Sequence, residues 1–323
     1  METEEYPFVS IVIPAYNEGD HIGKCLAALI SQNYPDDRYE IIVVDNGSSD
    51  NTVAEAQRFD VRVLSKPAVK VGAVRNFGVA HSRGDILAFI DSDCIAQPNW
   101  LSAGVSALKK ENVGAVGGGC LLREEPSWIE KGWKLGKEGS DEQVTSLAGG
   151  SFLVKANLFR KLNGFDESIN AGEDTKLSRD IASLGYRLLF LKECFVVHLG
   201  YPTTIKGFFK REYWHSSSYL NSQTGFNDLM FFSVLAFTFS NISLLIYLLS
   251  QDLLVLYGAA FLVISPFMFL VKNIKKVGIE NLEYRRIPSA VLVSYIYYYG
   301  RSCGLINSCI NVIADTFKSK KKA

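Results

Sequence analysis

Asp91 and Asp93 end an apolar run that begins at Gly84. They stand two positions apart, and residues i and i+2 of an extended segment point to the same side. Two carboxylates held close together repel each other unless a cation lies between them. Hard divalent ions such as Mg²⁺ and Mn²⁺ prefer oxygen ligands and commonly bridge to phosphates. The spacing therefore predicts a divalent-cation site, with a solvated turn as the alternative.

A second polar position follows an apolar run at Asp45, and a third follows the run that ends at Pro14. In open α/β sheets, ligands bind beyond the carboxyl ends of the strands. We therefore interpret Asp45 as a ligand-binding residue. The neighbouring Ser48, Ser49 and Asp50 are typical of a turn that caps a helix.

Glu173 and Asp174 open a segment with a helical pattern over Thr175–Leu184. The helix macrodipole favours acidic residues in a first turn, but the same place suits a general base for an incoming hydroxyl group. The residue types leave both interpretations open. His198 follows a predicted strand, Arg187–Val197, where a histidine is either structural or a ligand.

These residues need a layered scaffold, and the chain offers one between residues 8 and 200. Short apolar runs rich in Val and Ile alternate with amphipathic helical patterns, which argues for an α/β domain with a mostly parallel sheet. The predicted strands are Phe8–Pro14, Glu40–Asp45, Val61–Leu64, Ile86–Asp91 and Val113–Gly117, and the first helices are His21–Gln32 and Thr52–Phe59.

Taken in order, the motifs resemble those of family 2 glycosyltransferases, which are inverting nucleotide-sugar enzymes with the GT-A fold. The resemblance covers about residues 7–215. It rests on the segments Ile13–Glu18, Val44–Asp50, Gly72–Gly78, Phe89–Asp93, Ala148–Ser151, Asn163–Asp166 and Gly172–Asp174.

The resemblance implies a role for each motif. Asp174 is expected to be the catalytic base, with Glu173 as the alternative. Asp93, Asp91 and His198 are expected at a Mg²⁺ or Mn²⁺ ion that offsets charge on the departing nucleoside diphosphate. The residues expected to bind the nucleotide sugar are Pro14, Ala15, Tyr16, Glu18, Asp45, Lys66, Arg75, Asp91, Gly149 and Gly150.

Processive members of the family carry Gln-x-x-Arg-Trp after the base. Here the corresponding stretch is Phe209-Lys-Arg-Glu-Tyr-Trp214, which keeps the Trp but lacks the Gln and Arg at that spacing. The departure argues against a polymer-extruding synthase. Arg211 and Trp214 are expected either at the acceptor site or on an amphipathic helix at a membrane surface.

Beyond residue 225 the chain becomes strongly apolar. Leu229–Ser250 and Leu253–Val271 contain no charged residue. Each is long enough to cross a hydrocarbon core of about 30 Å. The basic stretch Lys272–Arg286 predicts that the side to which this hairpin returns is cytoplasmic. A third stretch, Ile287–Ile313, precedes a basic tail, and we favour an interfacial or re-entrant helix over a third span.

The composition sets outer limits. Residues 1–200 carry 21 basic and 28 acidic side chains, whereas residues 201–323 carry 13 and 6, so two parts in different surroundings are expected. A charged fraction of 21% with 48% hydrophobic residues excludes a disordered chain. Six cysteines without close pairs predict buried thiols in a reducing compartment. The N-terminus lacks the pattern of a signal peptide, so export of the first domain is not expected.

The predicted organisation is a GT-A catalytic domain (1–200), an amphipathic interfacial segment (201–228), a transmembrane hairpin (229–271), and a basic loop with a third helix and tail (272–323). The predicted protein is a multi-pass enzyme of the cell membrane with a cytoplasmic catalytic domain. It would pass a sugar, from a donor expected to be a UDP-sugar, to a lipid-linked or glycan acceptor. Its expected partners are these substrates and membrane lipids, without nucleic acid, and the oligomeric state is left open. The alternatives are a processive synthase, a nucleotidyltransferase and a non-catalytic membrane protein.

Overall fold

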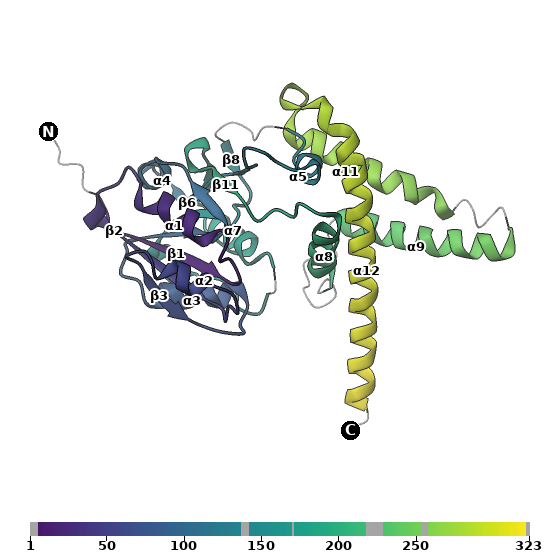
Figure 1. Cartoon of the computed structure of the whole chain (residues 1–323), viewed down its shortest axis with the longest axis horizontal. Helices are drawn as coiled ribbons and strands as arrows, with labels where there is room; N and C mark the ends of the chain where they lie inside the picture. The colour runs from purple at the N-terminus through teal and green to yellow at the C-terminus, as the bar shows by residue number, and fades with distance from the viewer. Residues whose placement is uncertain (1–5, 137–141, 170, 218–228, 253–257, 321–323) are drawn as a thin grey trace. The chain divides into compact units, whose positions relative to one another are not determined.

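The computed structural model describes residues 6–136, 142–169, 171–217, 229–252 and 258–320 (Figure 1). The chain divides into two compact units. The first comprises residues 1–123 and 138–200, and the second comprises residues 124–137 and 201–323. The second unit therefore includes residues 124–137, and the extent of the catalytic domain, predicted as 1–200, stays a prediction. Each unit is described by itself.

The first unit is built on an eight-stranded sheet in the order β3-β2-β1-β4-β9-β6-β10-β8. The pairs β3–β2, β2–β1, β1–β4 and β6–β10 are parallel, so the predicted mostly parallel sheet is confirmed. β9 runs antiparallel between β4 and β6. The strands are β1 (Val9–Ala15), β2 (Tyr39–Asp45), β3 (Arg62–Ser65), β4 (Ile86–Ile90), β6 (Val113–Gly117), β8 (Glu142–Val144), β9 (Ser151–Lys155) and β10 (Arg187–Phe190).

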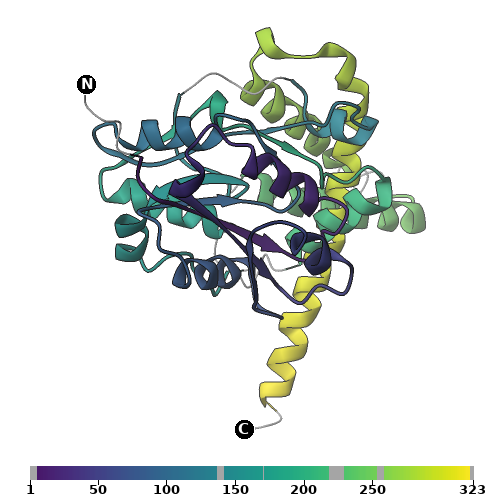
Figure 2. The same ribbon diagram turned by 60° about the vertical axis from the view of Figure 1, so that its left-hand side comes forward.

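Alternate side chains of the strands enter two separate cores, as the two-residue period of a strand requires. Ile11 and Ile13 pack with one set of helices, whereas Val12 packs on the other face. The first face carries α1 (Ile22–Ile30), α2 (Thr52–Ala56) and α4 (Trp100–Leu108). The opposite face carries α3 (Val71–Ala80), α6 (Ala156–Lys161) and α7 (Glu173–Ser183), and Figure 2 shows helices on both sides of the sheet.

A smaller sheet pairs β5 (Cys94–Ala96), β11 (Val196–His198) and β7 (Cys120–Leu121) in the order β5-β11-β7. The predicted single strand Arg187–Val197 is therefore wrong. β10 ends at Phe190 beside β6, and the short helix η2 (Lys192–Cys194) leads the chain into this second sheet as β11. In the antiparallel register of β5 and β11, His198 lies opposite Cys94.

The second unit is helical. Its aromatic core joins Phe208, Phe237, Val293 and Tyr298 from three different helices. The elements are α5 (Trp128–Trp133), α8 (Ile205–Ser216), α9 (Leu229–Ser250), η3 (Gly258–Ala260), α11 (Phe261–Val277), η4 (Ile279–Asn281), η5 (Tyr284–Arg286) and α12 (Ile287–Lys320).

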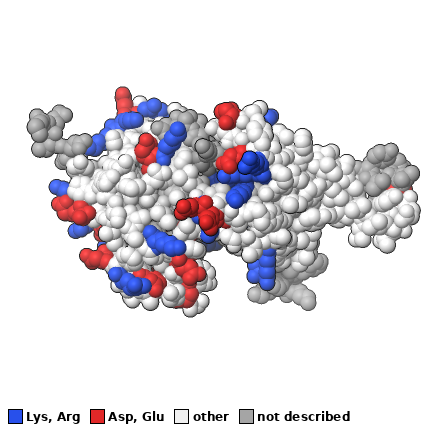
Figure 3. Space-filling view, turned by 45° about the horizontal axis from the view of Figure 1, so that its top comes forward, with Lys and Arg blue, Asp and Glu red and all other residues white. Residues whose placement is uncertain are grey.

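Two segments, Leu229–Ser250 and Gly258–Lys275, are long and apolar enough to cross a membrane, although core helices of soluble proteins can pass the same test. Only 17% of the apolar window in the second is buried inside the protein, and large side chains such as Leu249 and Phe267 are exposed. The face drawn in Figure 3 shows few charged side chains over the long helices and many over the sheet-containing unit. A soluble core helix would instead be mostly covered.

Several sequence-based boundaries in this unit need correction. The predicted start of the second span, at Leu253, lies outside the described residues. α11 continues to Val277, so the lysines at 272, 275 and 276 are helical and do not lie in a loop. The helix continues through Pro266 and ends before Gly278, whose φ is +80°.

α12 is one continuous helix of 34 residues. A re-entrant segment must turn back on itself, so this continuity excludes the re-entrant alternative for Ile287–Ile313. α12 is not among the candidate spans found in the described residues, and its interfacial position stays a prediction. Cys303 and Cys309 on this helix are exposed, which corrects the expectation of six buried thiols. None of the six cysteines forms a disulfide bond in the part of the chain that the structure describes.

Candidate functional site

An open pocket of about 230 Å³ lies at the carboxyl ends of β1 and β4 in the first unit. Its lining includes six residues expected in a nucleotide-sugar or metal site, together with four others. The expected ones are Pro14, Ala15, Tyr16, Glu18, Asp91 and Asp93, and the others are Asn46, Val71, Val74 and Ser92. A larger cavity of about 540 Å³ borders Phe8, Asp85 and Lys155 and contains none of the expected residues. Because open α/β sheets bind ligands beyond the carboxyl ends of their strands, the smaller pocket is the candidate site.

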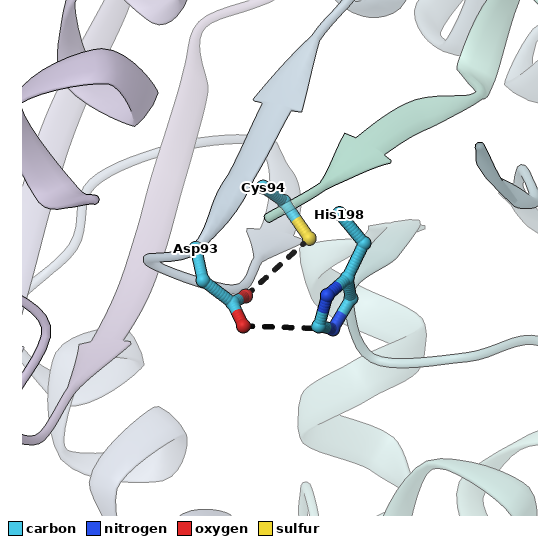
Figure 4. A group of neighbouring side chains, drawn as sticks. All are labelled: Asp93, Cys94 and His198. Atoms are coloured by element: carbon cyan, nitrogen blue, oxygen red, sulfur yellow. Dashed lines mark hydrogen bonds and ion pairs between the residues drawn. The ribbon is translucent and has the colours of Figure 1, made fainter. Parts of the chain in front are cut away.

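Asp93 lies beside His198 and Cys94 (Figure 4). Its Oδ2 is 3.5 Å from Nε2 of His198, and its Oδ1 is 3.6 Å from Sγ of Cys94. All three ligand atoms lie within 4.8 Å of one another. Burial raises the pKa of Asp93, and the facing His198 opposes the rise. The arrangement provides one oxygen, one nitrogen and one sulfur atom for a metal ion.

Asp91 has a different partner from the one expected. Its Oδ1 accepts a hydrogen bond of 2.7 Å from the guanidinium of Arg75. Asp91 is not part of the metal-binding group around Asp93 found in the described residues. The charge of Asp91 is therefore balanced by the guanidinium of Arg75.

Arg75 is buried, with a side chain only 4% exposed. Besides Asp91, its guanidinium binds the carboxylate of Glu173. The electrostatic attraction of these carboxylates raises the pKa of Arg75 although burial opposes the rise. Arg75 thus links two acidic residues, and its expected contact with the diphosphate stays a prediction.

Asp174 and Glu173 occupy contrasting environments at the start of α7. Glu173 is 5% exposed, and its burial raises its pKa while the attraction of Arg75 lowers it. Asp174 is half-buried and accepts a hydrogen bond of 2.8 Å from the backbone N–H of Gly149. The preceding Gly172 has a φ of +93°, which a residue with a side chain rarely adopts. The geometry favours Asp174 over Glu173 as the residue that meets a substrate.

Gly149 and Gly150 lie against the charged network. A Cβ atom on Gly149 would be 2.8 Å from Nη2 of Arg75, and one on Gly150 would be 3.1 Å from Oδ2 of Asp91. A side chain at position 149 would therefore displace the Arg75 guanidinium, whereas one at position 150 would need Asp91 to shift by a few tenths of an ångström. Their expected contact with a sugar stays a prediction.

Asp45 and Lys66 lie outside the lining of the pocket. Asp45 is 6% exposed, and its carboxylate accepts hydrogen bonds from the backbone N–H groups of Gly47 and Ser48. It therefore has a structural role in the turn after β2, and a role in binding a base is untested. The ammonium group of Lys66 lies 5.2 Å from the centre of the Phe77 ring.

Glu18 is paired with His21, with 2.7 Å between Oε2 of Glu18 and Nδ1 of His21. Burial raises the pKa of Glu18, and the hydrogen bond with His21 opposes the rise. Tyr16 beside it is 58% exposed. An exposed aromatic ring at the mouth of a pocket is suited to stacking on a planar ligand.

The expected acceptor residues belong to the second unit. The guanidinium of Arg211 stacks on Trp133 and Phe208, at 4.6 Å and 4.7 Å from the ring centres. It also pairs with the buried Glu212, which binds Arg301 of α12 as well. Trp214 is 54% exposed. Arg211 is thus part of the packing between helices.

Two residues at the site, Cys94 and Gly200, were not predicted from the sequence. Cys94 directly follows Asp93, so an Asp-x-Asp-Cys pattern was its only signal. Gly200 lies so close to Asp93 that a Cβ atom there would overlap the carboxylate. Nothing in the sequence joins positions 93 and 200, because the backbone contact between Leu199 N–H and the carbonyl oxygen of Asp93 forms only in the fold.

Comparison with known proteins places these features in a family context. A model described as "Glycosyl transferase family 2" matches residues 10–157, and one described as "Glycosyl transferase family group 2" matches residues 86–274. Glycosyltransferase AglE of Haloferax volcanii is 32% identical over 215 residues, which are 62% of this chain and 69% of that protein. Probable glycosyltransferase YdaM of Bacillus subtilis is 30% identical over 216 residues, which are 58% of this chain and 49% of that protein.

Two solved structures have a similar fold. Mannosyltransferase PcManGT from Pyrobaculum calidifontis, in complex with GDP-Man and Mn²⁺, has a TM-score of 0.56 and 18% identity, covering 97% of this chain and 88% of that chain. GalNAc-T7 with UDP, GalNAc and Mn²⁺ has a TM-score of 0.51 and 18% identity, covering 70% and 53%. At these identities the similarity establishes the fold alone, and it confirms the expected GT-A fold.

Proposed function

The chain belongs to glycosyltransferase family 2, and from that premise we propose that it transfers one sugar, with inversion, from a nucleotide-sugar donor to a lipid-linked or glycan acceptor. The observation that carries the proposal is the link made by Arg75. It joins Asp91 in the pocket to Glu173, the neighbour of Asp174. The buried guanidinium of Arg75 thereby fixes the donor side of the proposed transfer site relative to the acceptor side.

In the proposed mechanism the pocket holds the nucleoside diphosphate. Tyr16 and Ala15 line the side expected to contact the base, and Asp91 and Asp93 line the side of the phosphates. Asp45 is expected to contact the base beyond the pocket, so we propose a UDP-sugar as the first donor to test. Of the two solved structures, one contains GDP-Man and the other UDP, so a guanine donor needs the same test.

Asp174 is the proposed base. Its Oδ2 accepts the Gly149 N–H, and its Oδ1 accepts the Thr175 N–H at 2.6 Å, so the carboxylate is held in one orientation. A carboxylate in this position can take the proton of an acceptor hydroxyl during attack on the anomeric carbon. Glu173 is committed to Arg75 and positions the start of α7.

The residues around Asp93 fit a divalent cation. The carboxylate of Asp93 and the imidazole of His198 face each other, with 3.5 Å between Oδ2 and Nε2. A bound cation would supply charge stabilisation for the departing diphosphate. Asp93 and His198 are the proposed ligands, whereas Asp91 is already neutralised by Arg75. Both solved structures contain Mn²⁺.

We further propose that the enzyme is a multi-pass protein of the cell membrane with its catalytic unit on the cytoplasmic side. The support is the pair of apolar segments, together with Lys272 and Lys275 near the end of α11 and Arg285 and Arg286 beyond it. Basic residues at a membrane surface favour the cytoplasmic side. A location at the membrane would bring a lipid-linked acceptor within reach.

The test is a donor screen that measures release of nucleoside diphosphate across UDP- and GDP-sugars, with the full chain in membranes. Asp93→Ala and Asp174→Asn should each lower release by at least about 100-fold while the protein still folds. Turnover like that of the wild type in both variants would refute the site. Full activity in excess chelator would remove the metal from the mechanism.

Other functions predict other products. Chondroitin synthase of Pasteurella multocida is 25% identical over 214 residues, only 22% of its own length. A processive synthase would give long products on a gel, whereas a single transfer gives one addition. Release of pyrophosphate would instead identify a nucleotidyltransferase, and failure to bind any nucleotide sugar in calorimetry would favour a non-catalytic protein.

A further inference from the structure

The group formed by Asp93, Cys94 and His198 contains a thiol that the proposed mechanism does not use. Figure 4 shows the three side chains pointing toward one another. The antiparallel register of β5 and β11 places Cys94 opposite His198, and Asp93 directly precedes β5. The backbone therefore brings the three side chains together before any ion binds.

The three side chains are close enough to share one ion. Zinc binds carboxylate oxygen and imidazole nitrogen at about 2.0–2.2 Å and thiolate sulfur at about 2.3 Å. Oδ2 of Asp93 lies 3.5 Å from Nε2 of His198, whereas its other oxygen, Oδ1, lies 3.6 Å from Sγ of Cys94. One ligand atom from each residue lies within 4.8 Å of the other two. A turn of the carboxylate would let a single oxygen face both the imidazole and the thiol.

Protein groups enclose these side chains. Cys94 is fully buried, so its sulfur faces only protein groups. A Cβ atom on Gly200 would overlap Asp93. This glycine thus allows the backbone to pass close to the carboxylate.

We propose that Cys94 is a thiolate ligand of the cation centre, which makes the centre prefer a borderline ion such as Zn²⁺ or Co²⁺ to Mg²⁺. Soft thiolate ligands favour such ions, whereas Mg²⁺ requires oxygen ligands in near-ideal octahedral geometry. Binding converts the thiol to a thiolate, and its proton leaves to solvent. Three protein ligands leave one tetrahedral position open, as in catalytic zinc sites. The inference rests on the proposed function, because the proposed sugar transfer is what gives the open position on the ion a role.

The test is a Co²⁺ titration of the full chain in detergent, read by absorption. The background carries Cys303→Ser and Cys309→Ser, because these two exposed thiols could bind the ion by themselves. We expect a thiolate-to-cobalt charge-transfer band that saturates at one equivalent. Cys94→Ser should remove the band and weaken Co²⁺ binding at least about 10- to 100-fold, the range for loss of an outer-shell partner alone.

Cys120 provides the matched control. Its thiol forms a hydrogen bond with Cys94, so it is the neighbouring sulfur most able to mislead the experiment. Cys120→Ser should keep the band. The inference is overturned if the band is absent, if it survives Cys94→Ser, or if Mg²⁺ displaces Co²⁺ equally well from the wild type and from that variant.

Two readouts keep the result independent of folding and of transfer. X-ray absorption of the Zn²⁺-loaded chain detects a sulfur neighbour without any substitution, and a shell of oxygen and nitrogen alone would overturn the inference. Release of nucleoside diphosphate tests the proposed function separately. A thiolate-to-cobalt band without sugar transfer supports the inference and counts against the proposed function. Sugar transfer without a sulfur ligand supports the proposed function and overturns the inference.

Discussion

The guanidinium of Arg75, in α3, is ion-paired with the carboxylate of Glu173, the first residue of α7. Their side chains are 4% and 6% exposed, so the pair is shielded from water. Removing one member of a buried pair leaves the other charged and unsatisfied, which is strongly destabilising. The pair also fixes the start of the helix that carries Asp174. Its loss should therefore affect both stability and transfer.

Arg75→Met should lower the free energy of unfolding by about 3–5 kcal/mol, because Glu173 and Asp91 lose their common partner. The control is Arg58→Met, since Arg58 is 70% exposed and pairs with Glu55 on a helix surface. That loss should be about 1 kcal/mol or less. Denaturant unfolding of both variants measures the difference. Equal losses would show that the Arg75 network contributes no more than a surface pair.

Asp174→Asn and Glu173→Gln should separate chemistry from positioning. Asparagine can still accept the Gly149 N–H but cannot take a proton, so kcat should fall about 10²–10⁴-fold with little change in the unfolding temperature. Glu173→Gln should mainly reduce stability, because it removes one charge of the buried pair. Steady-state kinetics beside thermal unfolding checks both. If Glu173→Gln lost more kcat than Asp174→Asn, the roles would be reversed.

The sequence was a good guide where a single segment carries its own signal. β1, β2, β4 and β6 lie within about a residue of their predicted ranges, since buried Val- and Ile-rich runs ending in polar residues are characteristic of such strands. β9 was not predicted as a strand, because its start had been read only as the motif Ala148–Ser151. The strand after α7 was predicted too long, because both of its halves are apolar.

The site was predictable as a set of motifs but not as a set of partners. Pro14, Tyr16, Glu18 and Asp91 line one pocket because they lie at or just beyond the carboxyl ends of β1 and β4, which meet at the same edge of the sheet. Arg75 and Glu173 are 98 positions apart, and their pairing depends on how α3 and α7 pack on the same sheet face. No local pattern reveals such a contact, so Arg75 was assigned to the diphosphate.

Gly200→Ala should disturb the cation site without touching a ligand. The new methyl group would overlap the Asp93 carboxylate, which must then turn away from His198. A misplacement of about 1 Å can cost about 10²-fold in rate, so transfer should fall by about that much. Gly23→Ala in α1 is the control, because its Cβ would meet nothing closer than 3.9 Å. The transfer rates and Co²⁺ affinities of both variants check the prediction. A transfer rate for Gly200→Ala equal to that of the wild type would contradict it.

His215 should make the second unit less stable in mild acid. Burial lowers its pKa to about 4, with Glu212 opposing and Arg301 and Arg211 adding to the decrease. Between pH 6.5 and about 4 the unfolded chain therefore binds a proton that the folded chain does not, so stability falls as the pH falls through this window. The loss is at most about 3 kcal/mol.

His215→Gln should remove this contribution to the pH dependence, and His81→Gln, at an exposed histidine of the other unit, should leave it unchanged. Thermal unfolding of the full chain in detergent, from pH 7.5 to 4, gives the comparison. Parallel curves for the wild type and His215→Gln would show that His215 has an ordinary pKa in the folded protein.

Gly304→Leu should loosen the packing of α12 on α8. A Cβ atom on Gly304 would overlap Ser216 Oγ and the carbonyl oxygen of Tyr213. A Cβ atom on Gly300, one turn away, would lie 3.0 Å from the carbonyl oxygen of Phe209. Small residues four positions apart allow helices to approach closely, and overpacking such a contact costs about 1–3 kcal/mol. Cys303→Leu is the control, because this neighbour is exposed on the same helix. Detergent-phase unfolding should separate the two variants, since only the leucine at position 304 must displace the backbone of α8.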